Sequence, residues 1–238
     1  QFAFVDLDGN RYIAIGTDKF LLIYFEGQLY DITPLKATLA SCTIATTNNS
    51  AVCSITKSNH GLSAGDIVLL DNVTLPGGTG YSNSDFEDKL FQVTSITSTS
   101  VFTITQSSNA TATVSTGGSL SVKPYEQVGP AEQSYGYGWG IDSWGSGNWG
   151  EAASASDVSL EPGLWSLSNF GQVLVATIAN GKTFTWNAGA ASPLTVRAST
   201  STSGFSTSNN PTATRVTLVS PTTRHLIHLG TETTIGDT

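Results

Sequence analysis

The residues that could do chemistry in this chain are few, and their spacing fits no catalytic centre. Its three histidines are His60, His225 and His228. The last two would point to opposite faces of a strand, which is poor geometry for sharing a metal ion. His60 precedes a turn glycine, and we interpret it as a ring hydrogen-bonded to the turn backbone rather than as a ligand. We therefore expect no zinc site.

Two groups of carboxylates invite a functional interpretation. The run from Asp6 to Asn10 (DLDGN) looks like the start of a calcium loop, but position twelve of such a loop is acidic and here is Thr17. We interpret the run as a polar turn between strands. Glycan hydrolysis needs two carboxylates that face one another. Asp85, Glu87 and Asp88 form the only local acidic cluster, and we interpret them as solvated loop charges.

Other catalytic motifs are missing from the sequence. It has no G-x-S-x-G elbow, no glycine loop followed by Lys that would cradle phosphate, and no Cys/His pair with an orienting acid. We predict a protein that is not an enzyme and that uses no metal or cofactor.

Residues 135–150 (YGYGWGIDSWGSGNWG) alternate large aromatic rings with glycines. Glycine is costly inside helices and strands and is kept where the backbone bends or approaches another surface closely. We predict an irregular ribbon whose rings pack either on the chain's own sheets or on a neighbouring copy. The candidate packing or interface residues are Tyr135, Tyr137, Trp139, Trp144, Trp149 and Trp165.

The charge of the chain is low and acidic. Charged residues make up 12% of its 238 residues and the net charge is -8, so the basic footprint of a nucleic-acid-binding protein is absent. Between residues 125 and 160 there are acidic side chains but no Lys or Arg, which fits a solvated loop or an electrostatic role. An acidic wall would let a polyanion slide past without binding it tightly. No apolar run approaches the length of about 18 residues that spans a bilayer.

The elements that must position these residues are strands. Segments of period two are rich in Val, Ile, Thr and aromatic residues, and no helix is predicted, so the chain is all-β. These segments are 12–15, 20–25, 29–32, 51–55, 67–70, 90–96, 101–105, 173–179, 183–186, 215–219 and 225–229. Two hairpins, 21–32 and 173–186, look like copies of one unit, and the second turns at Asn180-Gly181, where both residues can take positive φ. Repeated hairpins fit a β-propeller or a β-sandwich.

Three motifs follow one another along the chain: residues 29–34 (LYDITP), 135–150, and 164–171 (LWSLSNFG). Together they resemble the tail nozzle, or tail hub, proteins of short-tailed bacteriophages. The resemblance implies a structural subunit of the virion tail, assembled in the host cytoplasm, in which six copies close into a ring. That ring would contact the head-to-tail adaptor protein and tail fibres, and genome DNA would pass through it without tight binding. It also implies that the main β domain is incomplete in this chain.

The middle of the chain differs in composition and is rich in Thr and Ser. Residues 60–66 (HGLSAGD) and 91–96 (FQVTSI) resemble the small β-barrel modules that recur as insertions in phage tail proteins. We therefore divide the chain into a first part of the main β domain at 1–38, an inserted barrel at 39–124, the Gly/aromatic acidic ribbon at 125–160, and the rest of the main domain at 161–238.

Two alternatives to the nozzle function remain open. The first is a receptor- or glycan-binding tail fibre or adhesin module, in which Trp139, Trp144 and Trp149 would stack on sugar faces. The second is a cell-wall hydrolase, which the lack of an acid pair disfavours.

Cys42 and Cys53 lie on the two strands of an expected hairpin and could form a bridge if they are close together. Phage structural proteins assemble in a reducing cytosol, so we favour two free thiols in the core.

Overall fold

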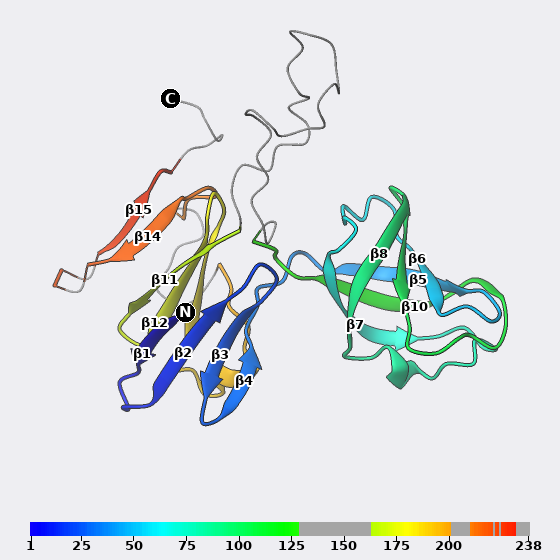
Figure 1. The fold of residues 1–238 in the computed structure, drawn as a ribbon, viewed down its shortest axis with the longest axis horizontal. Helices are drawn as coiled ribbons and strands as arrows, with labels where there is room; N and C mark the ends of the chain where they lie inside the picture. The colour runs from blue at the N-terminus through cyan, green and yellow to red at the C-terminus, as the bar shows by residue number, and fades with distance from the viewer. Residues whose placement is uncertain (129–162, 201–209, 221, 224, 232–238) are drawn as a thin grey trace, which may run out of the picture. The chain divides into compact units, whose positions relative to one another are not determined.

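The computed structural model describes residues 1–128, 163–200, 210–220, 222–223 and 225–231. The chain divides into two compact units, one formed by Gln1–Pro34 with Gln127–Thr238 and the other by Leu35–Glu126. Within the described ranges both units consist of antiparallel strands and loops with short 3₁₀ turns, and none of these residues is in an α-helix. The prediction of an all-β protein is confirmed (Figure 1).

The first unit starts with a four-stranded meander. Its strands are β1 (Phe2–Val5), β2 (Arg11–Gly16), β3 (Leu21–Phe25) and β4 (Gln28–Asp31), and they pair in the order β1-β2-β3-β4. The turn from β3 to β4 is made by Glu26 and Gly27, both at positive φ (47° and 83°). Positive φ at both positions is what a two-residue hairpin turn needs to match the twist of its strands.

A second, three-stranded sheet contains β11 (Trp165–Phe170), β12 (Val173–Ile178) and β13 (Thr183–Asn187). At the turn from β12 to β13 Asn180 has positive φ (59°) and Gly181 does not, although both residues can adopt it. The amide of Gly181 donates to the Ile178 carbonyl, and the amide of Ile178 donates to the carbonyl of Lys182. The loop is therefore one residue longer than the two-residue turn that Asn-Gly usually makes.

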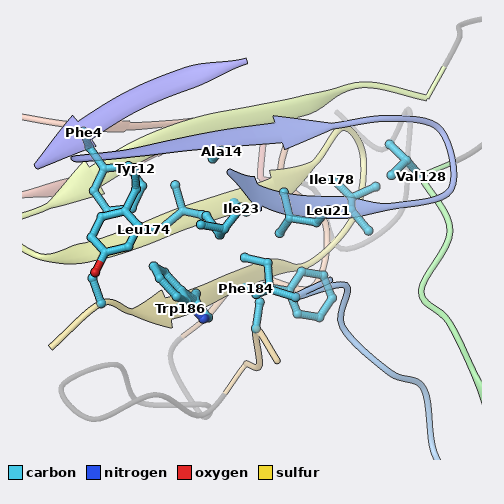
Figure 2. Packing of buried hydrophobic residues seen from close by; sticks show 14 residues of the cluster. Phe4, Tyr12, Ala14, Leu21, Ile23, Val128, Leu174, Ile178, Phe184 and Trp186 are labelled. Atoms are coloured by element: carbon cyan, nitrogen blue, oxygen red, sulfur yellow. The ribbon is translucent and has the colours of Figure 1, made fainter. Parts of the chain in front are cut away.

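The inner faces of these two sheets pack against each other and form the core of the first unit. Phe4 and Tyr12 from the first sheet gather around Trp186 of β13, while Leu21 and Phe184 lie toward the other end of the cluster (Figure 2). The indole of Trp186 meets the ring of Tyr12 edge to face, with 5.6 Å between their centroids. Two sheets face to face are the arrangement of a sandwich, and the propeller interpretation stays a prediction.

A two-stranded sheet completes the first unit. β14 (Val216–Val219) pairs with β15 (Leu226–Leu229) in antiparallel register.

The second unit is a closed six-stranded barrel, so the small β-barrel that the sequence led us to expect is confirmed. Its strands are β5 (Leu39–Thr46), β6 (Val52–Thr56), β7 (Ile67–Thr74), β8 (Leu90–Ser98), β9 (Val101–Thr105) and β10 (Val114–Pro124). The long strand β10 closes the barrel because it pairs with β5 along one edge and with β7 along the other. Alternate residues point inward, and those fully buried include Ile44, Ile55, Leu70, Phe102 and Ile104.

The two ends of the barrel unit lie side by side. Leu35 and Tyr125 form an antiparallel bridge, and the Lys36 amide donates to the Pro124 carbonyl at 2.8 Å. A segment whose ends meet in this way can be inserted into a loop of another fold with little disturbance.

Candidate functional site

Among the six aromatic candidates, Trp165 is in the part of the chain that the structure describes. The other five lie outside the described residues: Tyr135, Tyr137, Trp139, Trp144 and Trp149.

Trp165 opens β11 and ties this strand to the turn between β2 and β3. Its indole Nε1 donates to the Thr17 carbonyl at 2.9 Å, and its ring meets Phe184 edge to face at 6.3 Å. The ring lies so close over Gly16 that a Cβ at that position would collide with it. Glycine is therefore required at residue 16 by the packing of Trp165.

A groove of about 440 Å³ lies beside Trp165. Its lining mixes apolar and polar groups: Gln1, Gly16, Thr17, Asp18, Gly163, Leu164, Trp165 and Leu167. Leu164 is 61% exposed at its rim. An aromatic ring beside a carboxylate and an amide can stack on and hydrogen-bond to a polar ligand such as a sugar or a peptide segment.

The LYDITP motif forms a latch between the first sheet and the segment after β13. Nη1 of Arg197 lies 2.9 Å from Oδ2 of Asp31 and also donates to the Thr33 carbonyl at 3.0 Å. The Thr33 hydroxyl donates to Asp31 Oδ1 at 2.6 Å and accepts the amide of Leu21 at 2.9 Å. These contacts hold the first sheet to the residues around Arg197, so the motif is structural here.

A row of hydroxyls links the second sheet to the hairpin of β14 and β15. Thr177 lies on the face of β12 opposite the core, and its hydroxyl is 2.7 Å from that of Thr217 on β14. The Ser166 hydroxyl donates to the carbonyl of Thr217 at 3.0 Å. Since Thr217 is 1% exposed, β14 covers this face of the second sheet.

His228 ends this row of hydroxyls. Its Nδ1 is 3.1 Å from the Thr217 hydroxyl, and desolvation by burial lowers the pKa of the imidazole. The ring thus favours its neutral form and acts as a hydrogen-bond partner inside the fold.

His60 holds the loop that precedes β7 in the barrel. Its Nδ1 accepts the Leu62 amide at 3.0 Å, so Nε2 carries the proton that is donated to the Ser98 carbonyl, also at 3.0 Å. The ring packs edge to face on Phe102. The interpretation of His60 as a ring hydrogen-bonded to the backbone of its turn is confirmed.

Asp6 organises the turn between β1 and β2. Its Oδ1 accepts the amides of Asp8 and Asn10 at 2.9 and 2.8 Å. The interpretation of this run as a polar turn is therefore confirmed. Desolvation alone would raise the pKa of Asp6, but these bonds and those from the side chains of Asn10 and Tyr12 lower it.

Asp85, Glu87 and Asp88 are loop carboxylates as expected, the first two half-buried and the third exposed, but two of them also bind the backbone. Oδ2 of Asp85 accepts the amide of Ser82 at 2.8 Å, and the Glu87 carboxylate accepts the amides of Asn72 and Val73. The carboxylates of Asp71, Glu87 and Asp88 come within 4.8 Å of one another. The Lys123 ammonium pairs with Asp71 and lowers the pKa of that carboxyl, so the cluster already has structural partners.

The two cysteines are free and buried, which confirms the prediction of core thiols. The hairpin of β5 and β6 forms as expected, but its register places Thr46, rather than Cys42, opposite Cys53. At about 3.4 Å per residue the two cysteines are offset by about 14 Å along the hairpin. A disulfide needs Cα atoms no more than about 7 Å apart.

No family model matches the chain, and no curated protein matches its sequence. Among solved structures, an endosialidase of phage phi92 is similar with a TM-score of 0.31 and 14% identity. The match covers 74% of this chain and 27% of the endosialidase chain, a likeness too weak to inform the function. Within the described ranges, helices with the length and apolar character of a bilayer span are absent.

Proposed function

We propose that this chain is a structural subunit of a bacteriophage tail, of the nozzle type, and that it works without catalysis. Six copies would form a ring in the virion, in contact with the head-to-tail adaptor protein and tail fibres. The observation that carries the proposal is that residues of the quoted motifs hold the sheets of the first unit together. Asp31 and Thr33 latch the first sheet to Arg197, and Trp165 fastens β11 to the turn at Thr17.

The environment of the ionisable groups supports a role without chemistry. Asp6 and His60 bind backbone groups in turns, Glu87 binds backbone amides of β7, and Asp71 is paired with Lys123. His228 is engaged with Thr217. A general acid or base has to reach a substrate proton, and each of these five side chains already has a partner inside the fold.

The net charge of -8 supports a channel through which DNA passes without being bound tightly. Binding to phosphates by Lys and Arg releases counterions and gives an affinity that falls steeply as salt is raised. We expect negligible binding of double-stranded DNA at physiological salt, measured by mobility shift or fluorescence anisotropy. Tight binding with a steep salt dependence would contradict passive conduction.

A glycan-binding tail module is the second candidate, and the groove beside Trp165 favours it. Binding of sugars would be detected by a glycan array followed by titration calorimetry. The variants Leu164→Ala and Asp18→Asn change exposed or half-buried groups of the groove and should weaken such binding, whereas Leu7→Ala, in the β1–β2 turn, should not. Specific binding that the groove variants abolish would replace the nozzle proposal.

A further inference from the structure

The hairpin of β14 and β15 is held on the second sheet by a small contact. Figure 1 shows the hairpin in orange to red beside the yellow-green strands β11 and β12. Within the two strands of the hairpin only Thr217 is buried, while Val219 and Leu226 are half-buried on the same side. The Ser166 hydroxyl of β11 lies within hydrogen-bond distance of both the carbonyl and the amide of Thr217. A segment with so few buried side chains opens at a lower cost than the core of its unit.

A row of hydrogen bonds runs from β13 through this contact to His228. The hydroxyls of Thr183 and Thr177 are 2.8 Å apart, and that of Thr177 donates to Thr217 at 2.7 Å. The Thr217 hydroxyl lies 3.1 Å from Nδ1 of His228. A hydroxyl has one proton, so Thr183 donates to Thr177 and the proton of Thr217 is left for the imidazole. Nδ1 is therefore the acceptor at the end of the row, and the neutral ring carries its proton on Nε2.

Protonation of His228 conflicts with this row. An imidazolium carries a proton on both ring nitrogens, so its Nδ1 proton would meet the proton of the Thr217 hydroxyl. Nδ1 could donate only after the buried hydroxyls had reversed together. Desolvation acts in the same direction, because burial lowers the pKa of the imidazole.

The strands around His228 offer no carboxylate that could neutralise its charge. Residues 163–231 contain no Asp or Glu, and this range includes β11 to β15. Strands β11 to β14 carry no titratable side chain. Among the described residues, those that border these strands and can carry a charge are Lys182, Arg215 and His225, which are exposed and basic. A charged His228 therefore gains no ion pair from the strands that the structure places against it.

We propose that protonation of His228 releases the β14–β15 hairpin from the second sheet. The hairpin is then a pH-sensitive cover of the first unit, a property that goes beyond the assembly proposed above and does not depend on it. Release exposes the imidazolium to water and uncovers Thr177 on the outer face of β12. The core between the first two sheets stays closed, because it lies on the opposite face of the second sheet.

Hydrogen–deuterium exchange of the whole chain, followed by mass spectrometry, measures this release. After correction for intrinsic exchange rates, the protection of the β14 and β15 amides should fall by up to about tenfold for each pH unit below 6.5, the limit for uptake of one proton, until the folded pKa is reached. Amides of β2, β3 and the barrel should keep their protection down to pH 5.

Two matched variants test whether His228 is the responsible group. His228→Gln should keep the protection of the hairpin constant between pH 7.5 and 5. His225→Gln, at an exposed position of the same hairpin, should behave as the unmodified chain does. Circular dichroism and thermal melting establish that both variants fold.

An NMR titration of the unmodified chain provides a check that needs no variant. The ring protons of His228 and the amides of β14 and β15 should titrate with one midpoint. Hairpin protection that stays constant down to pH 5, an equal loss of protection in His228→Gln, or separate midpoints would each overturn the proposal. A simultaneous loss of protection in β1–β4 would also overturn it, because the whole first unit would then be unfolding.

Discussion

Two carboxylates, those of Asp6 and Glu87, hold backbone amides, the first in its own turn and the second in strand β7. Each accepts two backbone amides, from Asp8 and Asn10 in one case and from Asn72 and Val73 in the other. The short side chain of Asp6 binds amides of its own turn, which have no strand partners there. For this reason an acidic cluster in the sequence was a poor guide to chemistry.

His228 makes the stability of the chain depend on pH. Its folded pKa lies below the usual 6.5 because burial disfavours the imidazolium. The unfolded chain then takes up the proton more readily, so stability is full above about pH 6.5 and falls as pH drops through the folded pKa. Urea unfolding of the unmodified chain between pH 5 and 8 should show this decline, and His228→Gln should flatten it.

The carboxyl groups with lowered pKa do not cause a loss of stability between pH 5 and 8. The lowered pKa values of Asp6, Asp71 and Asp85 lie below 3.8, so the stability linked to these groups is lost at lower pH. An unchanged slope in His228→Gln above pH 5 would show that another group is responsible.

Cys42 and Cys53 should resist alkylation in the native chain. Burial raises the pKa of both thiols, and the reactive species is the thiolate. Mass spectrometry after iodoacetamide treatment at pH 7.5 should find both thiols unmodified in the folded chain and both modified in urea. Rapid native labelling of either one would contradict its position in the barrel core.

At the scale of elements, the latch around Asp31 is the contact that should be most sensitive to single substitutions. Asp31→Ala and Arg197→Ala should each lower the free energy of unfolding by about 1–3 kcal/mol, since each leaves polar partners unpaired. The double variant should lose less stability than the sum of the two single losses, with a coupling energy of about 1 kcal/mol. Arg11→Ala, at an exposed position, is the control and should change stability by no more than about 0.5 kcal/mol. Strictly additive losses in urea unfolding would mean that the ion pair adds nothing.

Most strands were predictable from period-two patterns, and the strands that were missed have physical reasons. β1 (FAFV) is too short to show a period. β10 is rich in Ser and Gly, whose small side chains give little contrast between the two faces. β11 (WSLSNF) is half-buried at all six positions, so its two faces differ little from one another.

The whole molecule was less predictable than its elements. Sequence patterns could not show that Arg197 meets Asp31, because the two residues are distant in sequence and their meeting depends on how the sheets stack. That β14 covers the second sheet follows from the contact between Thr177 and Thr217, which no sequence pattern indicates.

The barrel unit should be removable. Its ends meet at Leu35 and Tyr125, so joining Pro34 to Gln127 through a short Gly/Ser linker should leave the first unit folded. The isolated segment of residues 35–126 should also unfold cooperatively, because it is a closed barrel with its own core. Circular dichroism and thermal melting of both products provide the check. Loss of all β signal after excision would show that the two units depend on one continuous core.

The central claim is that copies of this chain assemble into a ring. Negative-stain electron microscopy of the purified protein at high concentration tests that claim most directly. The account predicts closed particles with six-fold symmetry and a central channel. A protein that remains monomeric at every concentration, or that forms particles without a channel, would contradict it.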